Sequence, residues 1–147
     1  MNRIRLSILL VLVTSLLSAC GGGDDKIVLR MGHTLDTEHN VHKAMEYMAQ
    51  QLDKYSNGTM EIRIYPSAQL GTEREMVELL QIGSLAMTKV SAAAIEGFVP
   101  EMKVYSIPYI FRDRAHRWAV LQSEVGEALL KETESAHLVG LGYYDSG

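Results

Sequence analysis

The spacing of apolar residues changes period several times after residue 26, as expected for strands that alternate with helices. Ile27–Met31 is a compact apolar run ended by Gly32, and this predicts a buried strand. Residues 41–55 repeat apolar side chains at spacings of three and four, which predicts a helix with one apolar face. Residues 60–65 alternate between apolar and polar, which predicts a strand with one exposed face.

A second helix and a third strand are predicted next along the chain. Thr72 and Glu75 have the spacing of a capping box, so a helix is expected from there to about Ile82. Ala86–Val90 is predicted to be the third strand.

The pattern beyond residue 91 is less regular. The two prolines within residues 92–111 favour loops and short extended pieces there. Asp113 and Ser123 are placed to cap two further helices, and Leu138–Tyr144 is predicted to be a fourth strand. Strands alternating with helices predict an α/β domain, with a mainly parallel sheet flanked by helices.

Ligands of such sheets bind beyond the carboxyl ends of the strands. This rule selects polar residues after three of the predicted strands, namely His33 and Thr34, Lys89 to Ser91, and Tyr144 with Asp145. His33 and Thr34 are predicted to donate hydrogen bonds to a ligand. The alternative is a histidine that caps local backbone.

Lys89 interrupts a small and apolar segment, where an unpaired lysine is costly to bury. We expect it to meet an anion, either Glu73 or a ligand carboxylate. A surface lysine whose stem lies along the protein is the alternative.

Three further residues are candidate ligand contacts. Ser91 is a candidate hydroxyl donor or a plain loop serine. Glu73 contacts a sugar hydroxyl, or it is favoured in the first turn of its helix by the helix dipole alone. Only one of Tyr143 and Tyr144 is expected to reach a ligand, and Tyr144 is the candidate.

The N-terminus has the features of a secretion signal. A basic start, an apolar run and small residues before Cys20 resemble a bacterial lipoprotein signal, in which the cysteine is acylated. An ordinary signal followed by a chance cysteine is the alternative. We therefore predict a signal over residues 1–19, a flexible tether over 20–26 and a lobe over 27–147, held outside the cytoplasm at a membrane.

Charge and length limit the partners. The chain has 14 basic and 18 acidic residues, and loss of Arg3 and Arg5 with the signal leaves twelve against eighteen, a net charge of -6. Nucleic acid is therefore not an expected partner, because binding it requires clustered basic residues. The sequence ends where a predicted strand enters a turn, so we expect an N-terminal part of a longer protein.

Four segments in order resemble the solute-binding proteins of TRAP transporters, the DctP-type family. The segments are residues 65–75 (Tyr-Pro-Ser-Ala-Gln-Leu-Gly followed by an acidic helix), 83–87, 106–111 and 142–147. The resemblance implies a periplasmic receptor of two α/β domains, of which this chain is the N-terminal lobe, that closes on an organic acid and delivers it to a membrane permease. It implies no cofactor and no catalysis.

The departures from the family pattern bear on the ligand. Thr34 and Ser91 stand where sialic-acid-binding members carry asparagine and glutamate, and Ala86 stands where many members are acidic. These differences argue against sialic acid and favour a sugar acid such as a hexuronate, or next a C4-dicarboxylate. The arginine that grips the ligand carboxylate in this family is expected beyond Gly147.

Two other classes of protein stay open. His33, His39 and His42, with Asp36 and Glu38, suggest a zinc-binding lipoprotein, although this spacing is weak evidence and a solvated polar face is the favoured alternative. A secreted hydrolase would need a nucleophile encoded after the last residue, since no nucleophile motif is present here.

Overall fold

The computed structural model describes residues 26–145. Its first half is an alternating series of strands and helices, as the sequence predicts. The elements are β1 (Ile27–Gly32), α2 (Asn40–Tyr55), β2 (Met60–Tyr65), α3 (Glu73–Gln81) and β3 (Met87–Thr88).

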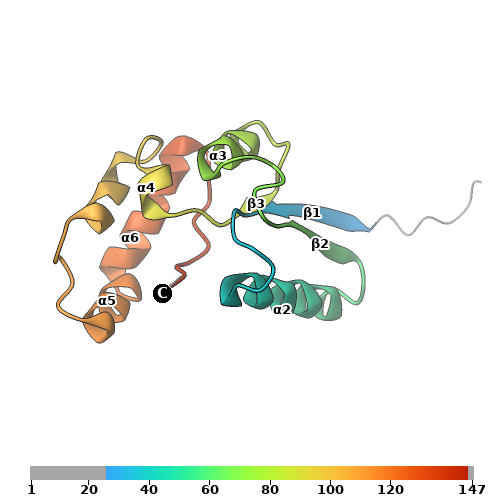
Figure 1. Cartoon of the computed structure of the whole chain (residues 1–147), viewed down its shortest axis with the longest axis horizontal. Helices are drawn as coiled ribbons and strands as arrows, with labels where there is room; N and C mark the ends of the chain where they lie inside the picture. The colour runs from blue at the N-terminus through green and yellow to red at the C-terminus, as the bar shows by residue number, and fades with distance from the viewer. Residues whose placement is uncertain (1–25, 146–147) are drawn as a thin grey trace, which may run out of the picture.

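The three strands form one parallel sheet in the order β2-β1-β3. Helices α2 and α3 cover opposite faces of this sheet, as Figure 1 shows. The prediction of a mainly parallel sheet flanked by helices is therefore confirmed.

Helix α2 supplies the main hydrophobic core. Its N-cap is His39, whose ring nitrogen accepts a hydrogen bond from the Val41 amide. The apolar stripe of the helix packs on β1 and β2, and Met45 is fully buried among Met31, Val41 and Ile62. The predicted helical face is thus the face that the fold buries.

Helix α3 packs on the other face of the sheet. Thr72 and Glu75 form the predicted capping box, with reciprocal side-chain to backbone hydrogen bonds. Met76 approaches β1 where Gly32 has no side chain, and a Cβ atom there would lie 2.6 Å from the Met76 sulfur. The glycine that ends β1 therefore makes room for this helix.

The second half of the described chain is helical and lies to one side of the sheet (Figure 1). Asp113 and Ser123 cap helices as predicted, and a second hydrophobic cluster forms around Val99, Met102 and Ala136. The elements are α4 (Ala92–Ile95), the 3-10 helix η2 (Pro100–Ser106), α5 (Arg114–Leu121), α6 (Glu124–Glu132) and the 3-10 helix η3 (Thr133–Ala136).

Two sequence predictions are wrong in this half. Residues 92–106 form helical turns rather than loops and extended pieces, because Ser91 caps α4 and Pro100 begins η2. Leu138–Tyr144 is not a strand, because the amides of Leu138 and Gly140 donate to Thr133 instead of to a neighbouring strand. The third strand is real but shorter than the predicted Ala86–Val90.

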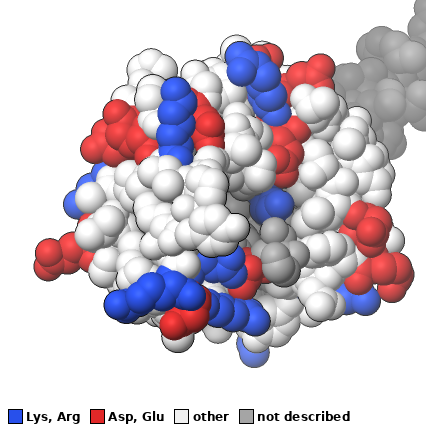
Figure 2. All heavy atoms as spheres, turned by 60° about the vertical axis from the view of Figure 1, so that its left-hand side comes forward, with Lys and Arg blue, Asp and Glu red and all other residues white. Residues whose placement is uncertain are grey.

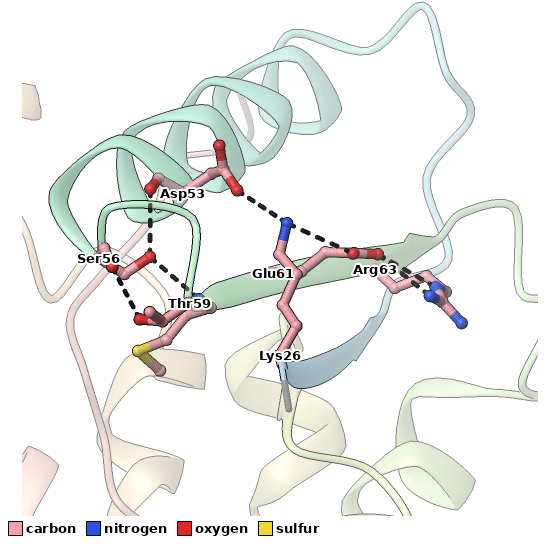
Figure 3. Close-up of polar contacts among 7 residues, drawn as sticks. Lys26, Asp53, Ser56, Thr59, Glu61 and Arg63 are labelled. Atoms are coloured by element: carbon pink, nitrogen blue, oxygen red, sulfur yellow. Dashed lines mark hydrogen bonds and ion pairs between the residues drawn. The ribbon is translucent and has the colours of Figure 1, made fainter. Parts of the chain in front are cut away.

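A polar network ties the starts of β1 and β2 to the end of α2, as Figure 3 shows. Lys26 Nζ lies 2.9 Å from Asp53 Oδ1 and 3.8 Å from Glu61 Oε2. The hydrogen bond that Lys26 donates to Asp53 raises the pKa of Lys26. Ser56 and Thr59 close the turn between α2 and β2 through hydroxyl to carbonyl hydrogen bonds. These contacts stabilise the end of the sheet at which β1 and β2 begin.

The predicted signal over residues 1–19, Cys20 and most of the tether over 20–26 lie outside the described residues. Within residues 26–145, no helix has both the length and the apolar character needed to cross a membrane.

Candidate functional site

The strand register brings the predicted ligand-binding edge together. Gly32 pairs with Tyr65 on one side and with Thr88 on the other, so all three strands end at the same level. The residues that follow β1 and β3, His33 and Lys89, therefore start from neighbouring positions at the carboxyl edge.

Three of the predicted residues meet at this edge, and we call Glu73, Lys89 and Ser91 the Glu73 group. The Ser91 amide and hydroxyl donate to Glu73 Oε2 at 3.0 and 2.6 Å. Lys89 Nζ lies 3.6 Å from Glu73 Oε1. The prediction that Lys89 meets an anion is confirmed, and the anion is Glu73.

Helix ends position the members of this group. Glu73 is the first residue of α3, where the helix dipole favours a carboxylate. Ser91 is the N-cap of α4, and its hydroxyl also accepts a hydrogen bond from the Ala94 amide. Ser91 is therefore not a plain loop serine.

Lys89 keeps hydrogen-bonding capacity that this contact does not use. Its side chain is only 10% exposed, and an ammonium group carries three N–H donors. The 3.6 Å separation from Glu73 is that of an ion pair and is too long for a hydrogen bond. Chemically, this is a partly buried cation able to donate to an incoming carboxylate or hydroxyl.

His33 lies behind this group and is completely buried. Its Nε2 atom lies 2.9 Å from His42 Nδ1, and its own Nδ1 accepts from the Leu35 amide at 3.2 Å. Burial, together with the charges of His42, Lys89 and His39, lowers the pKa of His33 below its usual value of 6.5. In this structure both ring nitrogens of His33 have partners within the chain.

Thr34 and Tyr144 lie apart from these contacts. Thr34 is half-buried beside His33. Tyr144 is 47% exposed, whereas the hydroxyl of Tyr143 bonds to the Tyr105 hydroxyl and to the Gly126 carbonyl. Of the two tyrosines, Tyr144 is the one whose ring is open to solvent.

Sequence reasoning missed a second charged cluster. Asp145 Oδ2 lies 3.2 Å from Arg114 Nε and 2.5 Å from Arg117 Nη2, and its side chain is 11% exposed. The arginines are three residues apart on α5, which is the spacing of one helix face. The spacing of the two arginines could have indicated a basic helix face. The sequence does not show that Asp145 would lie against this face of α5.

Figure 2 looks onto the side of the molecule on which α4, α5 and α6 lie. Basic and acidic side chains both occur on this face, and a hollow near its centre contains Lys or Arg atoms.

The zinc alternative receives no support from the geometry. Within residues 26–145, no group of three or more histidine, cysteine, aspartate and glutamate side chains is arranged to hold a metal ion. The rings of His33 and His42 instead bond to each other.

Comparison with known proteins identifies the family of this chain. The family model for bacterial extracellular solute-binding protein, family 7 (DctP), matches residues 31–147. The C4-dicarboxylate-binding periplasmic protein DctP of Rhodobacter capsulatus is 31% identical over 84% of this chain and 37% of its own length.

Solved structures give the same result. A TRAP periplasmic solute-binding protein from Xanthobacter autotrophicus with bound β-D-galacturonate has a TM-score of 0.78 and 34% identity, over 81% of this chain and 40% of that one. The sugar acid binding protein DctPAm from Advenella mimigardefordensis with galactonate has a TM-score of 0.80 and 28% identity, over 84% and 40%.

The chain thus spans about two fifths of the length of the relatives that it matches. Those relatives are substrate-binding receptors. A family match that covers nearly all of the described residues shows that this chain belongs to the DctP family of bacterial extracellular solute-binding proteins, family 7.

Proposed function

We propose that the complete protein containing this chain captures a small organic acid in the periplasm and delivers it to a TRAP permease. The ligand is a sugar acid such as a hexuronate, with a C4-dicarboxylate as the second choice. The protein performs no reaction on its ligand, and its work is a difference in affinity between an open and a closed form.

The observation that carries this proposal is the Glu73 group at the carboxyl edge of the sheet. Lys89 offers free N–H donors to a carboxylate from a site that is nine-tenths buried. Glu73 and Ser91 offer oxygen atoms that suit the hydroxyl groups of a sugar. A site that combines one cation with several hydroxyl partners fits a sugar acid better than an apolar acid.

The relatives support the same ligand class. Galacturonate and galactonate are bound in two of the similar structures, and C4-dicarboxylate binding is named for a relative. Thr34 completes the proposed site as the hydroxyl next to β1, and Tyr144 as an exposed aromatic ring. Because His33 is buried with both nitrogens occupied, we assign it a supporting position rather than a direct contact.

Calorimetric titration of the complete protein tests the ligand class. We expect D-galacturonate to bind with a Kd of about 1 μM or tighter, and succinate to bind more weakly. D-Galactose is the matched control, because it keeps the sugar ring and lacks the carboxylate that Lys89 would contact. Equal binding of galactose and galacturonate, or binding confined to amino acids or zinc, would contradict the proposal.

We also propose that Cys20 is acylated and anchors the protein to a membrane. The support is the basic start, the apolar run and the small residues that precede it. Replacing Cys20 with serine is expected to move the mature protein from the membrane fraction to the soluble periplasmic fraction. A mature serine variant, shown by mass spectrometry to lack residues 1–19, that still stays with membranes would mean that the thiol is not the anchor.

A further inference from the structure

The buried histidines His33 and His42 belong to a chain of hydrogen bonds with a fixed direction. A backbone N–H can only donate, so the Leu35 amide makes His33 Nδ1 an acceptor. A neutral His33 then carries its proton on Nε2 and donates to His42 Nδ1 at 2.9 Å. His42 in turn presents its Nε2–H to Glu46 Oε1 at 3.3 Å, at the surface of α2.

No lone pair is left free in this chain of contacts. A proton added at His33 Nδ1 would face the Leu35 N–H, and one added at His42 Nδ1 would face the His33 N–H. Either addition turns an acceptor into a donor opposite another donor, which costs a buried hydrogen bond. The pair therefore has one well-bonded protonation state, and that state is neutral.

The His33 ring accepts from Leu35 inside the segment that leads into the candidate site, and backbone hydrogen bonds tie that segment to the next loop. The His33 amide donates to the Tyr65 carbonyl, and the His33 carbonyl accepts from the Ala68 amide, both at 3.1 Å. The Ser67 amide donates to the Leu35 carbonyl at 2.8 Å. Residues 33–35 thus join the loops after β1 and β2, and Thr34 lies in the middle of this segment.

The charged groups near His33 do not favour a proton on its ring. Lys89 faces His33 from the end of β3, and His39 faces it from the start of α2. Glu46 is the acidic group that contacts the pair, and it touches only the outer nitrogen of His42. The negative charge of Glu73 is engaged by Lys89 and Ser91.

We propose that His33 and His42 are positioning residues for ligand binding. In their neutral state they hold residues 33–35 at the carboxyl edge of the sheet, and a proton taken up by the pair releases this segment and weakens binding of the acid. The inference rests on the proposed function, because it concerns the affinity of the same site. It implies that the receptor loads best above the usual titration range of histidine and unloads in acid.

The sign follows from linkage. Because the pKa of His33 is lowered from 6.5, the unfolded or released state takes up the proton first. The contribution of His33 is complete above pH 6.5, and it is lost as the pH falls from 6.5 toward the lowered pKa of the folded state. A sugar acid stays ionised through this window, because free carboxyl groups titrate near pH 4.

The first test is the affinity of the complete protein for D-galacturonate between about pH 7.5 and about pH 5. We expect the Kd of the unmodified protein to rise by about threefold to tenfold over this range, because linkage allows up to tenfold per pH unit. His42→Asn keeps an acceptor for His33 but removes one of the charges that lower the pKa of His33, so its loss of affinity is expected to begin at a higher pH. His137→Asn replaces an exposed histidine in the other half of the described chain, at a left-handed backbone position that asparagine also tolerates, and should retain the dependence of the unmodified protein.

Nitrogen NMR of the histidine rings provides a readout that needs no ligand. We expect His33 to carry its proton on Nε2, and the Leu35 amide signal to shift in acid in the unmodified protein and at a higher pH in His42→Asn. Absence of galacturonate binding at every pH would count against the proposed function alone. A Leu35 signal that does not respond to acid, or the same Kd profile in His42→Asn, would overturn the positioning role.

Discussion

Replacing Lys89 with methionine in the complete protein is expected to weaken D-galacturonate binding by about 10- to 100-fold. A hydrogen bond to a charged group contributes about 1.5–3 kcal/mol, and each 1.4 kcal/mol is a factor of ten in Kd. The loss should be large because Lys89 is only 10% exposed, so water cannot readily replace its charge. Calorimetric titration of the two proteins measures the ratio of the dissociation constants.

Lys54→Met is the matched control for this substitution. Lys54 is an exposed lysine in the last turn of α2, and its replacement removes the same charge far from the carboxyl edge. Its Kd should stay within about twofold of the unmodified value, because exposed charges contribute little at a distance. If both variants bind equally well, the ligand does not contact Lys89.

Replacing Gly126 with alanine is expected to destabilise the α5–α6 corner by about 2 kcal/mol or more. A Cβ atom at this position would lie 2.0 Å from the Leu121 carbonyl oxygen and 2.5 Å from its carbonyl carbon. The obstacle is backbone, so α5 and α6 must move apart. Alanine favours a helix over glycine by about 1 kcal/mol, which offsets only part of this cost.

Hydrogen exchange of the complete protein tests this prediction locally. Peptides from residues 114–132 should exchange faster in Gly126→Ala than in the unmodified protein. Gly97→Ala is the control, since its new methyl group would meet only the end of the flexible Arg74 side chain, at 3.1 Å. Unchanged exchange in Gly126→Ala would show that the corner relaxes without cost.

The sequence predicted the elements whose signals are local. The alternation of Met60–Tyr65 and the capping box at Thr72 depend on neighbours within a few residues, and the structure confirms both. Asp113 and Ser123 cap their helices for the same reason. Local hydrogen bonds and one-sided burial are sufficient to define such segments.

The prediction of a strand over Leu138–Tyr144 failed because a strand requires a partner. The apolar residues of this segment suit a sheet, yet Val139 and Leu141 are about three-quarters exposed. The Thr133 hydroxyl accepts a hydrogen bond from the Gly140 amide, so this amide cannot donate to a neighbouring strand. The spacing of apolar residues within 138–144 cannot reveal this hydrogen bond, because its acceptor is the Thr133 side chain of η3.

The residues of the candidate site also fall into those that the sequence predicted and those that depend on tertiary packing. Strand-end reasoning found Lys89 and Ser91, because the carboxyl edge of a parallel sheet follows from topology. It did not find the role of His42, which depends on the rotation of α2 over β1 and on a ring-to-ring contact. The apposition of Asp145 and Arg117 likewise depends on the path of the chain after η3.

The two hydrophobic clusters of the described chain have no residue in common, so each half has its own reserve of buried apolar surface. The contact between Glu73 on α3 and Ser91 at the start of α4 spans the boundary between these halves. Gln81 of α3 also donates to the Ala136 carbonyl of the second half, so a molecule that binds at Glu73 and Ser91 would add to contacts that already join the two halves. Ligand binding would then slow hydrogen exchange on both sides of the boundary, including in helices that do not contact the ligand.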